Sequence, residues 1–138
     1  MALTVAIKIL GNHCSLLTAD DISKVVALDQ DGLEYEISSF LYKATKSSAD
    51  ISCSISLLTK YIVYDDIRVA KYAATTLYNL SLIKSNVSTI QSGIARIVEA
   101  FCKHVKADAE CNGQHIQSEI KLIKSLCIDE AISASVGN

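Results

Sequence analysis

The chain has 138 residues, of which 50% are hydrophobic and 20% are charged, and its formal net charge is −2. This length is typical of one domain, and the hydrophobic content is ample for a core. The modest charge excludes a polybasic nucleic-acid binder, and the composition excludes a disordered tail. With no proline and five glycines, the chain favours helices over a many-turned β-sandwich. We therefore expect a single all-α domain over residues 1–138 that binds no nucleic acid.

Apolar residues at helical spacing, separated by short polar breaks, predict about seven helices. They fall at about residues 2–10, 18–28, 33–46, 49–63, 65–84, 87–107 and 114–126. Gly93 lies inside the sixth helix and predicts either a bend or a split. For Tyr61-Ile-Val-Tyr64, a short strand is the alternative to a helix end. Because the breaks are short, we expect successive helices to be antiparallel neighbours.

The starts of two helices carry recognisable signals. Thr18, with Asp21 three residues later, predicts a capping box, and Asp65-Asp66 predicts a capped start for the following helix. The apolar stripes then predict the buried faces. In the middle of the chain these are Ile22, Val25, Val26, Leu28, Leu33, Ile37, Phe40, Leu41, Ala44, Ile51, Ile55, Leu58, Ile62, Val63, Val69, Ala70, Ala73, Ala74, Leu77, Leu80 and Ile90. Toward the ends they are Val5, Ile9, Leu10, Ile94, Ile97, Val98, Phe101, Val105, Ile116, Ile120, Ile123 and Leu126.

The five cysteines are odd in number, widely spaced and without a C-x-x-C pair, which argues against a secreted disulfide framework. The apolar start MALTVAIKIL is too short for a signal peptide and is interrupted by Lys8. No apolar run approaches the roughly 20 residues that span a bilayer. We therefore expect a cytoplasmic or nuclear chain that binds no membrane. The Asn-x-Ser sequons at Asn79 and Asn86 are then accidental.

The most distinctive pattern lies in Asp65–Phe101. Its first helix contains the sequence AATTLYNLS over residues 73–81, Asn86 follows in the break, and GIARIV occupies residues 93–98. This stretch resembles an armadillo repeat. The resemblance implies an armadillo/HEAT-like right-handed stack of about seven antiparallel helices, with a concave face that binds a partner protein or an extended peptide. The apolar first helix leaves two further expectations open: self-association through that helix, or a chain that is a fragment of a longer solenoid.

The departures from the armadillo pattern reduce the range of ligands that we expect. Thr75 stands four residues before Asn79, where nuclear-import adaptors of the family carry a tryptophan, so the aromatic slots for basic peptides are missing. The segments between Asn86 and Gly93 and between Gly93 and Ile97 are each one residue short, and the usual proline is absent. The chain also resembles the PUL-type armadillo domains of ubiquitin-pathway adaptors. That resemblance implies docking to the tail of a hexameric AAA unfoldase.

Four polar residues predict the partner-binding face. Arg68, Lys71, Thr75 and Asn79 follow at spacings of three, four and four, which places them on one side of a helix, opposite its apolar stripe. In the armadillo family this side lines the concave groove. Asn79 would then hydrogen-bond the backbone of a passing peptide, and Arg68 with Lys71 would favour acidic groups. The alternative is a helix face that only contacts solvent.

Few residues of the sequence form a pattern typical of a catalytic or metal-binding site. Cys102, His104, Cys111 and His115 are zinc-ligand types, but their spacing matches no known zinc motif, so we expect buried cysteines and surface histidines. A small-ligand or metal-binding helical bundle with its site in this region is the alternative of a different class. Paired acids fall at helix starts, and no phosphate loop or catalytic constellation is present. We therefore expect a non-enzymatic chain without metal or cofactor.

Overall fold

The computed structural model describes residues 2–47, 50–108 and 116–136, with side chains for all of these except residues 107–108 and 128–136. It confirms the all-α prediction, because the described residues contain helices and turns and no strand. The helices are α1 (Ala2–Gly11), α2 (Ala19–Val26), α3 (Glu34–Thr45), α4 (Ile55–Tyr61), α5 (Ile67–Ser81), α6 (Lys84–Gln91), α7 (Ile94–Asp108) and α8 (Gln117–Val136). Two single 3-10 turns, Cys14–Leu16 and Ser52–Ser54, precede α2 and α4.

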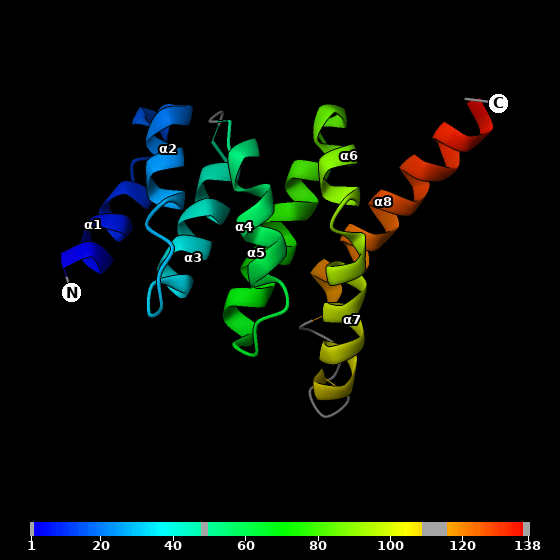
Figure 1. Cartoon of the computed structure of the whole chain (residues 1–138). Coiled ribbons are helices and arrows are strands. Elements are labelled where there is room, and N and C mark those ends of the chain that lie inside the picture. Colours follow the sequence, from blue (N-terminus) through cyan, green and yellow to red (C-terminus); the bar gives the residue numbers. More distant parts are fainter. Residues whose placement is uncertain (1, 48–49, 109–115, 137–138) are drawn as a thin grey trace.

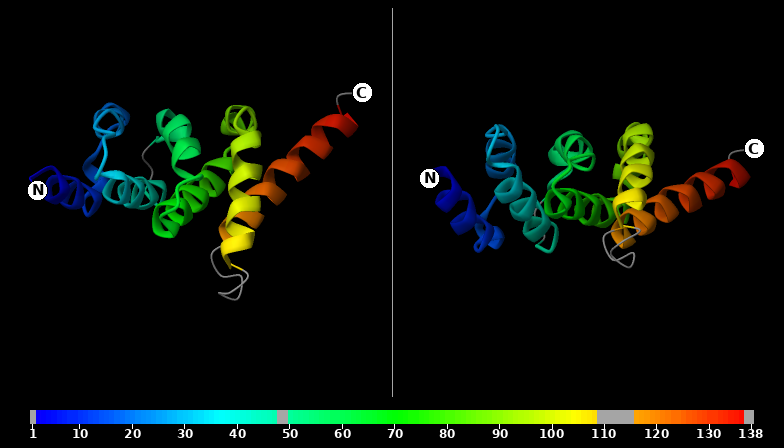
Figure 2. Two further views of the ribbon diagram at one scale, coloured as in Figure 1. Left: turned by 60° about the horizontal axis from the view of Figure 1, so that its bottom comes forward. Right: turned by 90° about the horizontal axis from the view of Figure 1, so that it is seen from below.

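The helices form an elongated arrangement with two layers. Helices α1, α3, α5 and α8 lie in one row, in which α3 packs against α1 and α5, and α5 packs against α8. Helices α2, α4 and α6 lie along one side of this row, above it in the right-hand view of Figure 2. The first and last helices lie at opposite ends of the molecule (Figure 1). Helix α5 is therefore central, since it contacts α3, α4, α6 and α8.

Local signals account for several helix boundaries. Thr18 and Asp21 form the predicted capping box, in which each side chain accepts a hydrogen bond from the other residue's backbone N–H, at 3.2 and 2.9 Å. Asp66 caps α5 by accepting from the backbone N–H of Arg68 at 3.0 Å. The alternative of a strand at residues 61–64 is wrong, because α4 ends at Tyr61 and a turn follows.

Gly93 splits the predicted sixth helix into α6 and α7. A methyl group on its Cα would lie 2.7 Å from the Cγ2 atom of Thr59 in α4. Carbon atoms pack at about 3.5–4.0 Å, so a side chain at position 93 would collide with α4. Glycine therefore allows the α6–α7 junction to approach α4 closely.

The core follows the predicted stripes in the middle of the chain. Most of the middle-chain residues predicted to be buried are buried. Val26, Leu28 and Val63 are exceptions, because they are half-buried at the edge of the core. The three alanines of α5, Ala70, Ala73 and Ala74, are buried, and their small side chains let neighbouring helices come close. The Tyr61 side chain is also fully buried, and its hydroxyl donates to Asp29 at 2.6 Å.

The predicted stripes of the terminal helices are partly wrong. In α1, Ile7 is buried, whereas Val5 and Ile9 are 56% and 54% exposed. In α7 the buried positions are Ile97, Ala100 and His104, and the apolar Ile94, Val98 and Val105 are exposed. In α8, Glu119, Leu122 and Leu126 are buried and Ile120 is exposed. These helices carry more apolar residues than their few neighbours cover, so periodicity alone does not fix the buried side.

Asn86 stabilises the turn between α5 and α6. Its side chain is 8% exposed, and its Nδ2 donates to the backbone carbonyl of Leu80 at 3.2 Å. A buried carbonyl near the end of a helix needs such a partner. The asparagine of the second sequon thus has a structural role in this turn.

Candidate partner-binding pocket

A pocket of about 340 Å³ lies between α3 and α5. Its lining comes from these two helices alone: Tyr35, Tyr42, Arg68, Lys71, Tyr72 and Thr75. Tyr35 and Tyr42 are seven residues apart, which is about two helical turns, so both project from the same side of α3. The apolar stripe of α3 occupies its other side and is buried.

Helices α3 and α5 run in the same direction beside the pocket. Near the start of both, the guanidinium carbon of Arg68 lies 4.5 Å from the ring centre of Tyr35. Near the end of both, the Nδ2 of Asn79 donates to the hydroxyl of Thr45 at 3.3 Å. Two parallel helices therefore present their polar residues side by side along one face.

Three tyrosine rings form the centre of the pocket. Tyr72 lies between the two tyrosines of α3, with ring centres 5.8 Å from Tyr35 and 5.4 Å from Tyr42. Both pairs are tilted, an arrangement that aromatic rings favour over a face-to-face sandwich. The pKa of Tyr35 is raised, first by a side-chain hydrogen bond with Tyr72.

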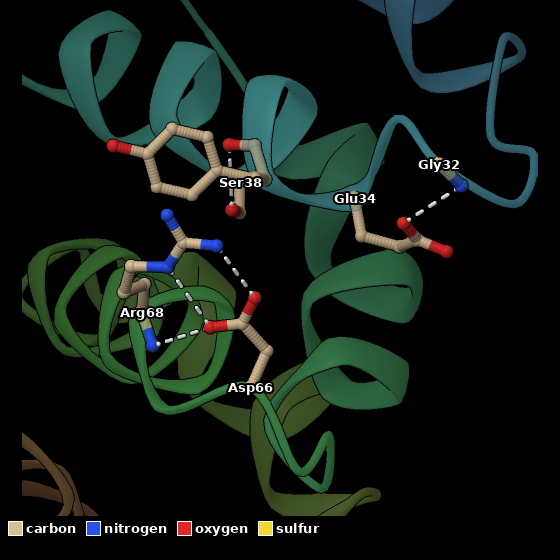
Figure 3. Close-up of polar contacts among 6 residues, drawn as sticks. Gly32, Glu34, Ser38, Asp66 and Arg68 are labelled. Atoms are coloured by element: carbon tan, nitrogen blue, oxygen red, sulfur yellow. Dashed lines mark hydrogen bonds and ion pairs between the residues drawn. The ribbon is translucent and has the colours of Figure 1, made fainter.

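Arg68 is held in place on one side of the pocket. Its Nε and one terminal nitrogen donate to the two carboxylate oxygens of Asp66 at 3.2 and 3.0 Å (Figure 3). The hydrogen bonds from Arg68 hold the pKa of Asp66 below its usual range. The guanidinium also lies over the ring of Tyr35. Arg68 is thus oriented before any partner arrives, and its charge is largely compensated.

The other predicted residues have different environments. Lys71 is exposed, and no carboxylate among the described residues lies within ion-pair distance of it. Thr75 is half-buried, and its hydroxyl lies 2.6 Å from the Ser118 hydroxyl of α8. Asn79 does not line the pocket, because its amide contacts Thr45. Arg68, Lys71 and Thr75 are therefore brought together, and Asn79 is set apart.

Sequence reasoning missed the three tyrosines. It located the aromatic slot of the armadillo family at Thr75 and found none there. The aromatic rings instead come from α3 and from Tyr72. A usable signal was the pair Tyr35 and Tyr42, spaced seven apart and off the apolar stripe of their helix.

A wider depression of about 710 Å³ lies between α4 and the α6–α7 junction. Among the residues that the structure describes, its lining includes Lys60 and Arg96, several hydroxyl side chains and no aromatic residue. The charge of Lys60 is compensated by Asp29, whose oxygen lies 2.6 Å from its Nζ. Burial raises the pKa of Asp29, but the hydrogen bonds from Lys60 and Tyr61 outweigh it, so the pKa is lowered. This depression lacks the aromatic anchors that dominate protein interfaces.

A buried histidine–glutamate pair joins α7, α8 and the turn before α5. His104 Nδ1 lies 2.5 Å from a carboxylate oxygen of Glu119, and Nε2 lies 3.3 Å from the backbone carbonyl of Tyr64. The two side chains are 2% and 1% exposed. The pKa of His104 is raised, first by the hydrogen bond with Glu119, although burial and the nearby Lys103 act in the opposite direction. Lys103 itself is paired with Asp65 at 2.5 Å.

The expectation of buried cysteines and surface histidines is therefore wrong for α7. Cys102 is exposed, as is Cys127 in α8, whereas His104 is buried. The reason is helix geometry, because His104 continues the buried positions Ile97 and Ala100 at helical spacing. Cys111 and His115, the other members of the predicted zinc-ligand set, lie outside the described residues.

Comparison of the chain with protein-family models, with curated proteins and with solved structures gave no match. Within the described ranges, no helix has the length and apolar character needed to cross a membrane. In the same part of the chain, no group of three or more histidine, cysteine, aspartate or glutamate side chains is arranged to hold a metal ion.

Proposed function

We propose that the chain is a non-enzymatic protein-interaction module, a scaffold or adaptor, that binds a partner protein or an extended peptide on the face formed by α3 and α5. We further propose an armadillo-like architecture and a cytoplasmic or nuclear location. The architecture rests on the sequence pattern of Asp65–Phe101 and on the order of helix packing. Each helix of the row α1, α3, α5 and α8 contacts its row neighbours, which is the kind of contact that stacked helical units use.

The observation that carries this proposal is the aromatic and cationic lining of the α3–α5 pocket. Tyrosine and arginine are enriched at the positions that dominate binding energy in protein interfaces. Tyr35, Tyr42 and Tyr72 offer rigid apolar rings with polar hydroxyls, and Arg68 is already oriented by Asp66. A pre-ordered surface loses less conformational entropy on binding than a mobile one.

Two alternatives are less well supported. Docking of an AAA unfoldase tail is a narrower form of the same proposal, and it rests only on the PUL-type resemblance. A metal-binding bundle with its site between Cys102 and His115 would need His104 as a ligand, yet both ring nitrogens of His104 face other acceptors. Metal analysis of the purified chain tests this second alternative, since a stoichiometric zinc content would favour it.

The proposal is tested by selecting random peptides of about 12 residues on the purified chain and measuring their affinity by fluorescence anisotropy. The two pocket variants are Tyr72→Ala and the double reversal Arg68→Glu with Lys71→Glu. The matched control reverses Lys24 and Lys84, which are exposed on α2 and α6 in the other layer. Each double reversal changes the net charge equally.

Selected peptides should bind the wild type and the control alike and should bind both pocket variants about tenfold or more weakly, the size expected for hot-spot positions. Equal affinity for all four proteins would contradict the proposal, as would the absence of any enriched peptide.

A further inference from the structure

We infer that the α3–α5 pocket recognises a carboxylate side chain flanked by apolar groups, with the carboxylate placed at the half of the pocket nearer Tyr42. This inference rests on the proposed function and names the chemistry of its ligand. The charges around the three tyrosines carry it, because they are distributed unevenly along the pocket.

The half of the pocket near Tyr35 is already neutralised. Arg68 forms two hydrogen bonds to Asp66, and Glu36 is a further acidic residue whose charge acts on both Arg68 and Tyr35. An incoming carboxylate gains little from a guanidinium that already holds one, and it would lie close to two negative charges.

The half near Tyr42 has the opposite character. Lys46 Nζ lies 4.4 Å from the ring centre of Tyr42, and Lys71 lines the same pocket. Among the described residues, neither lysine has a carboxylate within ion-pair distance. Lys46 over the Tyr42 ring, together with Lys71 in the lining of the same pocket, favours an anion at this end, and the ring edge favours apolar neighbours of that anion.

The pocket is better matched to a carboxylate than to a phosphate. Recognition of phosphorylated peptides commonly uses clustered arginine forks that bind several phosphate oxygens at once. Arg68 is the one arginine lining this pocket, and Asp66 occupies its fork. Lysines act as point charges on flexible stems, which suits a single aspartate or glutamate of a peptide.

The test uses the peptides selected on the wild-type chain. Each enriched peptide is made in three forms: with its acidic residues, with those residues changed to the matching amides, and with phosphoserine in their place. Affinities are measured against the wild type and the double variant Lys46→Gln with Lys71→Gln. The other proteins are Tyr72→Ala, Tyr72→Phe and the control double variant Lys24→Gln with Lys84→Gln, each checked for wild-type helix content.

We expect the selected peptides to be enriched in aspartate or glutamate beside apolar residues. The amide forms should bind the wild type about tenfold more weakly, and the double variant Lys46→Gln with Lys71→Gln should lose a similar factor, since each partly exposed ion pair contributes up to about 1 kcal/mol. That loss should shrink at high salt, and the control should bind normally.

The inference is overturned if peptides depend on Tyr72 but bind equally after the lysine changes, or if phosphoserine peptides bind more than tenfold tighter than the acidic ones. In both cases the proposed function stands. Tyr72→Phe keeps the aromatic ring and controls for correct folding of the pocket. If no selected peptide loses affinity for Tyr72→Ala, both the proposed function and the inference are wrong.

Discussion

At the scale of single residues, His104 is a titratable side chain that is buried and paired with a buried carboxylate. The imidazole lies between two acceptors, the carboxylate of Glu119 and the carbonyl of Tyr64. The second Glu119 oxygen is buried and has no hydrogen-bond partner in the described part of the chain. A ring with acceptors at both nitrogens is best satisfied when both carry a proton, which agrees with the raised pKa of His104.

This pair predicts a pH-dependent stability. Unfolded histidine titrates at about 6.5, and the folded pKa lies above that value. Below about pH 6.5 the pair contributes its full stability, and the contribution is lost as pH rises through the folded pKa. The difference in thermal midpoint between the wild type and His104→Gln should therefore be largest near pH 6 and shrink toward pH 9.

The matched control is His13→Gln, because His13 is exposed and its ring makes no hydrogen bond found in the structure. Its midpoint should follow that of the wild type at every pH. A wild-type-to-His104→Gln difference that stays constant or grows with pH would contradict the prediction.

Gly93 gives a second residue-scale prediction. Gly93→Ala places a methyl group against Thr59, and overpacking of this kind costs about 1–3 kcal/mol. Combining it with Thr59→Ser removes the Cγ2 atom, and the double variant should recover most of the loss. A double-mutant cycle in chemical denaturation measures this coupling, and additive effects would show that the two groups do not collide.

The residue scale also shows why the pocket was only half predicted. Arg68, Lys71 and Thr75 were found because a single helix displays its own periodicity. Tyr35 and Tyr42 belong to a different helix, α3. Helix α3 lies beside α5 because α4, which lies between them in sequence, packs in the other layer. For the same reason, the sequence alone did not identify Lys46 as a neighbour of the pocket. No spacing within one helix encodes a contact between two helices separated by a third.

At the scale of elements, the apolar stripes predicted the buried faces of α3, α4 and α5 well because each of these helices packs against several neighbours. Helix α5, with four helical neighbours, has room for only one exposed face, so its apolar residues coincide with its buried residues. Helix α1 contacts chiefly α3 and leaves Val5 and Ile9 exposed. The hydrophobic pattern therefore specifies a buried face only where packing uses all of it.

The capping box of α2 gives an element-scale prediction. Thr18→Ala removes the acceptor of the Asp21 N–H and should lower the free energy of unfolding by about 1 kcal/mol. Ser23→Ala, at an exposed position inside the same helix, is the control and should change stability by a few tenths at most. Urea denaturation followed by circular dichroism distinguishes the two, and equal effects would contradict a capping role.

At the scale of the whole molecule, the exposed apolar side of α1 predicts self-association. Val5 and Ile9, four residues apart and so on the same side of α1, are 56% and 54% exposed. Helix α1 lies at one end of the row (Figure 1). Burial of such a surface against a second copy would remove it from water. Light scattering should therefore give an average mass that rises with concentration for the wild type and stays monomeric for the double variant Val5→Glu with Ile9→Glu.

The control for this prediction is the double variant Leu82→Glu with Ile83→Glu, which changes two equally exposed apolar residues between α5 and α6. It should associate like the wild type. A wild-type mass that remains monomeric across the concentration range would count against association through α1.

The turn that Asn86 stabilises has a consequence for the order of events during synthesis. An oligosaccharide needs the Asn86 amide nitrogen in solvent, whereas the folded turn uses that nitrogen to bind the Leu80 carbonyl in a buried position. Sugar transfer and formation of the α5–α6 turn are therefore mutually exclusive. A chain that folds first is protected from modification at Asn86, and a chain glycosylated first cannot form the turn that leads from α5 into α6.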